Sequence, residues 1–195
     1  TIDTVTATAN AALPKAGGTL TGNLATAGIS AVTAGTSNFV AGVNAGNSIT
    51  SGGNYNTVVG DEAGTAITTG TRNTAVGKSA LGANTTANDN TAVGYEALDA
   101  NTTGADNTAV GKASLGANTT GAHNTAFGKA TLQANTTGAY NTTVGSESLL
   151  SNTTGNSNVA VGQSALAANT TGTENVAVGA LAGDAITTGS RNTAV

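Results

Sequence analysis

The stretch Asn73-Thr-Ala-Val-Gly77, continued by Lys-Ser-Ala-Leu-Gly-Ala and then by Asn84-Thr-Thr-Ala-Asn-Asp89, decides the fold of this chain. The same seventeen-residue pattern returns without insertion or deletion over most of the sequence. Its first asparagine stands at Asn56, Asn73, Asn90, Asn107, Asn124, Asn141, Asn158, Asn175 and Asn192. An unbroken short period of this kind is typical of stacked units in which each repeat contacts only its neighbours.

Each unit is predicted to form one coil, numbered here from position one at its first asparagine. Seventeen residues are too few for a helix-turn-helix repeat, and the valines of Asn158-Val-Ala-Val-Gly162 alternate as in a strand. We expect a first strand at positions two to four, with positions two and four facing inward. A second short strand is expected over positions six to eleven, as in residues 78–83, with Leu81 and Ala83 inward. The glycine at position five and the Asn-Thr-Thr-Gly stretch supply the corners, because Gly and Asn adopt positive φ readily.

The predicted fold is therefore all-β: an elongated, homotrimeric parallel β-roll or β-solenoid built from 17-residue coils and preceded by a short N-terminal stalk. The trimer is inferred from the alanines at position three, which would form a regular outward row (Ala75, Ala92, Ala109, Ala126, Ala160 and Ala177). One Val and one Leu per coil contribute about 1.5–3 kcal/mol each when buried, whereas ordering seventeen backbone residues costs roughly 17–34 kcal/mol. We therefore expect this second face to pack against identical chains.

Two coils depart from the common pattern. The segments 60–72 and 179–191 resemble each other more than the central coils. Both replace the leucine of position nine with glycine (Gly64 and Gly183) and the asparagine of position twelve with isoleucine (Ile67 and Ile186). Since the pattern resumes at Asn192, the second copy is interpreted as punctuation inside a longer array, and the sequence as a piece of a longer chain.

The expected domains are an N-terminal segment over residues 1–14, a Gly/Thr-rich β stalk and transition over 15–55, and the repeats over 56–195. Ile2, Val5, Ala9 and Leu13 stand at near-helical spacing before Pro14, which indicates a short helix or coiled coil.

The segment Leu13-Pro-Lys-Ala-Gly-Gly-Thr-Leu-Thr-Gly-Asn-Leu24 resembles an element that recurs in bacteriophage tail fibres. The Asn-Thr-Ala-Val-Gly repeats are similar to arrays in phage tail fibre and tail spike proteins. They also resemble the Asn-Ser-Val-Ala-Ile-Gly repeats in the heads of trimeric autotransporter adhesins, although the adhesin repeat is shorter. The resemblance implies trimeric parallel β-rolls, and a distal part with a receptor-binding tip or a folding chaperone domain.

The leading functional hypothesis is a structural component of a phage tail fibre, a trimeric rod that links the virion to a distal host-receptor-binding tip. The alternative is the head domain of a bacterial trimeric autotransporter adhesin. These two hypotheses place the protein in the virion or on the bacterial cell surface. The expected partners are further copies of the chain, other tail or baseplate proteins, and a host cell-surface glycan or protein bound through the distal part. An ice-binding solenoid and a polysaccharide-degrading tail spike are weaker alternatives.

The composition excludes several classes of protein. Charged residues make up 8% of the 195 residues, the formal net charge is −4, and there is no cysteine. An acidic chain is unsuited to nucleic acid, and the lack of cysteine excludes disulfides and thiolate metal sites. No apolar run reaches the roughly 18 residues that a membrane span needs.

Residues suited to catalysis do not gather in this sequence. His123, the only histidine, stands at the variable last position of its coil, and no Ser-His-Asp set forms around it. The carboxylates spread along the array, whereas a glycosidase needs two of them facing one cleft. We therefore predict no enzyme, no cofactor and no metal site. The side chains best placed to contact a host glycan are those of Tyr95, Lys112, His123, Lys129 and Tyr140.

Overall fold

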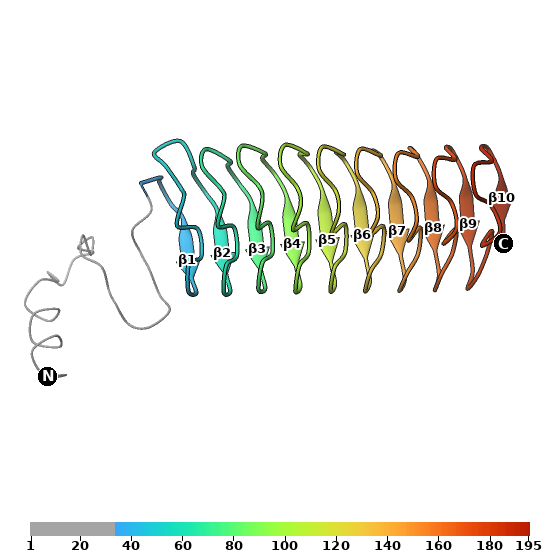
Figure 1. Cartoon of the computed structure of the whole chain (residues 1–195), viewed down its shortest axis with the longest axis horizontal. Coiled ribbons are helices and arrows are strands. Elements are labelled where there is room, and N and C mark those ends of the chain that lie inside the picture. Colours follow the sequence, from blue (N-terminus) through green and yellow to red (C-terminus); the bar gives the residue numbers. More distant parts are fainter. Residues whose placement is uncertain (1–33) are drawn as a thin grey trace, which may run out of the picture.

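The computed structural model describes residues 34–195, which form one straight parallel β-solenoid (Figure 1). Its strands follow one another along the rod in chain order and form a single ten-stranded sheet. They are β1 (Phe39–Ala41), β2 (Thr57–Val59), β3 (Thr74–Val76), β4 (Thr91–Val93), β5 (Thr108–Val110), β6 (Thr125–Phe127), β7 (Thr142–Val144), β8 (Val159–Val161), β9 (Val176–Val178) and β10 (Thr193–Ala194). The described residues contain no helix. The all-β parallel solenoid with a coil of about seventeen residues is confirmed.

Every strand pairs with the next in the same register. Val76 of β3 lies opposite Val93 of β4, and Val93 opposite Val110 of β5. Because neighbouring strands lie about 4.8 Å apart, nine steps give a sheet about 43 Å long. The exact period of the sequence thus becomes an even, unbroken stack. The segment expected at 1–14, the element Leu13–Leu24 and the first part of the expected stalk lie outside the described residues.

The solenoid begins one coil earlier than the repeat predicts. Residues 38–55, which belong to the expected transition, form a coil one residue longer than the others, and β1 pairs with β2 in the same register. Val40 and Ile49 of this coil are buried. The extra residue hides the coil from a strict seventeen-residue period.

The side of the strand that faces the core is the reverse of the prediction. The alanines of position three are fully buried, whereas the residues of positions two and four are half-buried or exposed. The expected outward alanine face is therefore wrong. In a three-residue strand, alternation alone does not tell which side points inward. The small alanine of position three shares the core with the larger leucine of position nine, as Ala75 does with Leu81.

The second strand expected over residues 78–83 is also wrong, because this side of the coil is a run of overlapping turns. In that coil the N–H groups of positions eight, ten and twelve donate to carbonyls three residues earlier (Ala80, Gly82 and Asn84). The intervening N–H groups bond to neighbouring coils: that of Ser79 to Asp61, and that of Leu81 to Ala97. Ser79 and Leu81 have φ of 56° and 52°, so left-handed residues curl the chain here. Leu81 is buried as predicted, whereas Ala83 is only half-buried.

Glycine is required at position five of the coil. Gly77 has a φ of 133°, and a Cβ atom on it would lie 2.4 Å from the carbonyl oxygen of Gly94 in the next coil. The same close approach recurs from coil to coil, so the backbones stack at this corner without room for a side chain.

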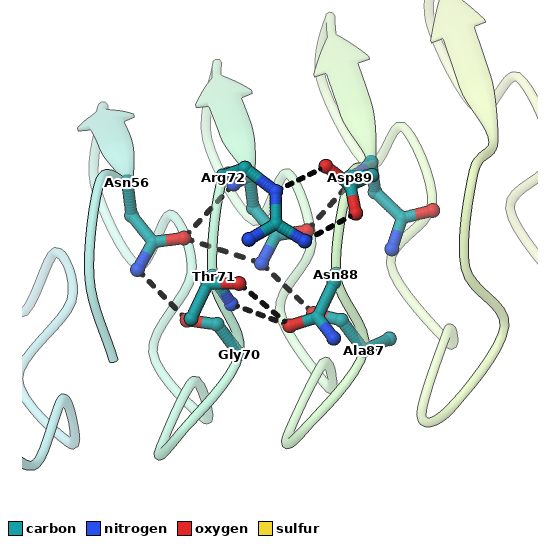
Figure 2. Close-up of polar contacts among 9 residues, drawn as sticks. Asn56, Gly70, Thr71, Arg72, Ala87, Asn88 and Asp89 are labelled. Atoms are coloured by element: carbon teal, nitrogen blue, oxygen red, sulfur yellow. Dashed lines mark hydrogen bonds and ion pairs between the residues drawn. The ribbon is translucent and has the colours of Figure 1, made fainter. Parts of the chain in front are cut away.

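Two ladders of buried asparagines run along the rod. At position one, the backbone N–H of Asn73 donates to Asn56 Oδ1 at 2.9 Å, and Asn73 Nδ2 donates to the carbonyl of Ala87 at 2.9 Å (Figure 2). At position twelve, Asn118 Nδ2 donates to Asn101 Oδ1 at 2.9 Å. Both ladders donate to the carbonyl of position fifteen. The asparagines of position twelve were predicted only as corners of the coil, although the repetition of asparagine at two fixed positions is the signal of a ladder.

In a coil with glycine at position nine, a side chain from another position fills the space that leucine occupies in the central coils. In residues 56–72 the space of the leucine is filled from position twelve by Ile67, which is fully buried, with help from Val58 at position three. A Cβ atom on Gly64 would lie 2.8 Å from Ile67 Cδ1. The core volume is therefore kept while the large side chain moves by three residues.

Candidate interaction surface

The outer side of the sheet presents two straight rows of uncharged side chains. We call this surface the outer sheet face; it consists of positions two and four of the strands, mainly threonine and valine respectively. Among the strand residues of position four, the most exposed apolar side chains are those of Phe127, Val144 and Val178, at 43%, 42% and 45% exposed. These rows were predicted to face inward. No pattern in the three-residue strands distinguishes the two sides.

All charged side chains of the described residues lie off this face. They occupy coil positions six, seven, ten and seventeen, which follow or precede the strand. Neither the strands nor their inner ladders carry a charge. The outer sheet face is therefore a continuous neutral strip, about 43 Å by 10 Å from strand spacing and rise.

The threonine hydroxyls differ between the face and the turns. At position thirteen, Thr119 Oγ1 donates to the carbonyl of Thr136 in the next coil at 3.0 Å, and the same bond recurs along the rod. These turn hydroxyls therefore bond each coil to the next. The threonines of the outer sheet face present methyl and hydroxyl groups from half-buried positions such as Thr91 and Thr108.

The charged side chains pair between successive coils. Arg72 Nε lies 2.6 Å from Asp89 Oδ1 (Figure 2), Lys78 Nζ lies 3.1 Å from Asp61 Oδ2, and Arg191 Nε lies 2.8 Å from Glu174 Oε2. The hydrogen bond from Arg72 lowers the pKa of Asp89 below its ordinary value, and Arg191 does the same for Glu174. Because the side chains of these pairs are exposed, each pair contributes little to the stability of the fold.

The five residues predicted to contact a glycan lie in two separate columns. Tyr95, Lys112 and Lys129 follow their strands at position six, and Lys112 Nζ lies 5.6 Å from the centroid of the Tyr95 ring. Lys129 Nζ lies 3.7 Å from Glu147 Oε1. The structure thus joins the first two and pairs the third with a carboxylate.

The other column precedes the strands at position seventeen. The rings of His123 and Tyr140 stack with centroids 4.9 Å apart and 13° between their planes. His123 Nδ1 lies 3.9 Å from Asp106 Oδ2 on its other side. Tyr140 is 62% exposed, so the stack offers an accessible aromatic face. Contact of either column with a host glycan stays a prediction.

A shallow polar groove crosses the turn side of the first coils. It has a volume of about 470 Å³, and Glu62, Thr65, Ser79 and Asp99 are among its lining residues. Burial and the nearby carboxylates of Glu96 and Glu62 raise the pKa of Asp99. Among the described residues, no group of three or more acidic or histidine side chains is placed to hold a metal ion.

Comparisons with known proteins return no match. No family model fits the chain, no curated protein is similar to it, and no solved structure matches its fold. Within residues 34–195, no helix is long and apolar enough to cross a membrane. The class defined by the structure is that of a parallel β-solenoid with one three-residue strand per coil and a neutral outer sheet face.

Proposed function

We propose that this protein is a structural rod in a bacteriophage tail fibre, where three copies link the virion to a distal tip that binds the host receptor. The observation that carries the proposal is the unbroken stack of coils from β1 to β10 in one register. Such a stack holds its two ends at a fixed separation, which is the mechanical task of a spacer.

The side chains of the rod support this task. The buried asparagines bond coil to coil along its length, for example Asn107 Oδ1 accepting from the N–H of Asn124 at 3.0 Å. Each coil also bonds to both neighbours through its backbone. Hydrogen bonds at several positions of each coil therefore join neighbouring coils, as a rod built from stacked repeats requires.

The head of a bacterial trimeric adhesin is the second candidate, because its repeats resemble the same coils. Both candidates require an elongated trimer at a surface, and they differ in what the rod is attached to. The segment Leu13–Leu24 resembles phage fibres and therefore favours the first.

The proposal is tested by the mass and location of the protein. Light scattering of the purified chain is expected to give three times the 18.4 kDa of one chain. Electron microscopy is expected to show straight rods. Antibodies against the chain should then label the tails of phage particles, whereas labelling of intact bacterial cells without phage would favour the adhesin head. A stable monomer would overturn the trimeric rod.

A further inference from the structure

The sequence Asn-Thr-Thr, an acceptor sequence for N-linked sugars, occurs seven times in the chain. Its asparagines are Asn84, Asn101, Asn118, Asn135, Asn141, Asn152 and Asn169. We propose that these asparagines are modification sites of the unfolded chain alone, and that N-glycosylation and folding into the rod exclude each other. The rod then forms only where no N-glycosylating transferase reaches the chain before it folds.

The folded rod hides all seven side-chain amides. Each of these asparagines is fully buried. Six of them stand at position twelve and Asn141 stands at position one, so both ladders are involved. Asn118 Nδ2 donates to Asn101 Oδ1 and to the carbonyl of Gly121, both at 2.9 Å. An amide nitrogen carries two hydrogens, and in Asn118 both are therefore used.

Sugar transfer to such an amide is incompatible with its hydrogen bonds. In the transfer, Nδ2 forms a bond to C1 of the sugar while the bond from C1 to an oxygen of a lipid diphosphate breaks. The diphosphate leaves with the electron pair, and a base takes one amide proton. The modified Asn118 keeps one N–H for two acceptors, so either Asn101 Oδ1 or the carbonyl of Gly121 loses its donor.

The stack of coils also lacks room for a sugar at this position. Asn118 bonds to Asn101 on one side and accepts from Asn135 Nδ2 at 2.8 Å on the other. Neighbouring coils lie only about 4.8 Å apart, whereas an N-linked sugar is bulky and polar. Because each coil contacts only its neighbours, one modified asparagine interrupts the rod at that coil.

The threonines that complete the acceptor sequences can be replaced without touching a ladder. Thr120, which completes the sequence of Asn118, is exposed, and so are its equivalents in the other position-twelve sequences. Thr143, which completes the sequence of Asn141, is buried at position three, where most coils carry alanine. Alanine in place of all seven threonines therefore removes the acceptor sequences and keeps the buried asparagines.

Expression of the chain in yeast, with and without a cleavable secretion signal, tests the proposal. The cytosolic chain is expected to carry no sugar, to resist protease and to show strands by circular dichroism. The secreted chain is expected to migrate on gels with up to seven sugar additions and to be digested under the same conditions. Mass spectrometry maps the modified asparagines.

Two comparisons separate the effect of the sugars from that of the secretory pathway. The first is the sevenfold variant with Thr→Ala at residues 86, 103, 120, 137, 143, 154 and 171. We expect its secreted form to resist protease as the cytosolic wild type does. The second is the wild-type chain secreted in the presence of an inhibitor of lipid-linked sugar synthesis, which should fold in the same way without any substitution.

Three outcomes contradict the proposal. A secreted wild-type chain that carries sugars on these asparagines and still resists protease overturns the exclusion. A secreted wild-type chain that folds without any sugar shows that the asparagines are not acceptor sites. Failure of the inhibitor-treated wild type to fold assigns the defect to the pathway instead of the sugars. The trimeric rod is tested separately, by the mass of the cytosolic chain.

Discussion

Asn169 and Ile186 occupy the same position in successive coils, and the side-chain oxygen of Asn169 lacks a partner for that reason. In earlier coils the corresponding oxygen accepts from the next asparagine, as Asn152 Oδ1 accepts from Asn169 Nδ2 at 3.1 Å. Ile186 has no donor, so Asn169 Oδ1 is buried without a hydrogen bond, alone among the side-chain atoms of the described residues. The ladder of position twelve therefore ends at the coil that has Gly183 at position nine and Ile186 at position twelve.

Extending this ladder should stabilise the rod. The double variant Gly183→Leu with Ile186→Asn restores the common pattern, and Gly183 already has the left-handed φ of 63° that the leucines adopt. Satisfying a buried acceptor contributes about 1–3 kcal/mol, so we expect the free energy of unfolding to rise by about 1 kcal/mol. Urea unfolding with circular dichroism measures it.

The two single variants provide the control for that prediction. A Cβ atom on Gly183 would lie 3.2 Å from Ile186 Cδ1, so leucine alone is overpacked. Asparagine alone at residue 186 leaves the space of the isoleucine empty. Both single variants should be less stable than the double variant. A free energy of unfolding of the double variant equal to the sum of the two single effects would contradict the idea that leucine and isoleucine fill the same space.

The ladder of position one should be more sensitive. Asn107→Ala removes the acceptor for the N–H of Asn124 and one donor to the carbonyl of Gly121. Because these groups are buried, we expect a loss of about 2–4 kcal/mol in thermal or urea unfolding. The matched control is Thr103→Ala on an exposed turn. An equal loss of stability in both variants would show that the buried asparagine stabilises the rod no more than an exposed turn residue does.

Two substitutions by valine test which side of the strand faces the core. Ala109→Val adds volume to a fully buried site and should cost about 1–3 kcal/mol. Thr108→Val makes a change that the chain itself carries at Val159 and Val176, and it should be nearly neutral. Unfolding of both variants decides the matter, and the reverse ranking would place position two inside.

The raised pKa of Asp99 predicts that its carboxylate lowers the stability of the folded chain in a pH-dependent way. Burial and the charges of Glu96 and Glu62 favour the neutral form in the folded state, so the folded chain binds more protons than the unfolded chain between the two pKa values. Stability therefore falls as the pH rises through that window. Asp99→Asn should raise the melting temperature at neutral pH, and the gain should vanish in acid below the ordinary pKa of aspartate.

The control for that experiment has the opposite sign. Arg72 lowers the pKa of Asp89, so the contribution of this carboxylate to stability is present at neutral pH and is lost as the pH falls through its folded pKa. Asp89→Asn should not stabilise the protein at neutral pH. A gain for Asp89→Asn equal to that for Asp99→Asn would point to net charge instead of local environment.

The sequence by itself determined the period, the parallel stacking and several residues of the core. A seventeen-residue unit repeated without slippage can stack only in register, and the leucines of position nine were predicted to face the core because they are the largest apolar side chains of the central coils. The glycine of position five was also predictable, because a corner repeated in every coil demands the same backbone freedom each time. The sequence shows that Gly64 and Ile67 replace the usual leucine and asparagine together, but it does not show that the isoleucine fills the space of the leucine.

The tertiary structure alone decided which side of the strand is the inside, and with it the candidate interface. Three residues alternate equally well with either side inward, so the choice depends on which of them packs with the buried leucines, as Ala75 does in the core that contains Leu81, and no local pattern expresses this. The asparagines were similarly ambiguous, since the same residue suits an exposed turn and a buried ladder. Only stacking shows that Asn56 and Asn73 bond to each other and are removed from water, leaving the valines and threonines to face outward.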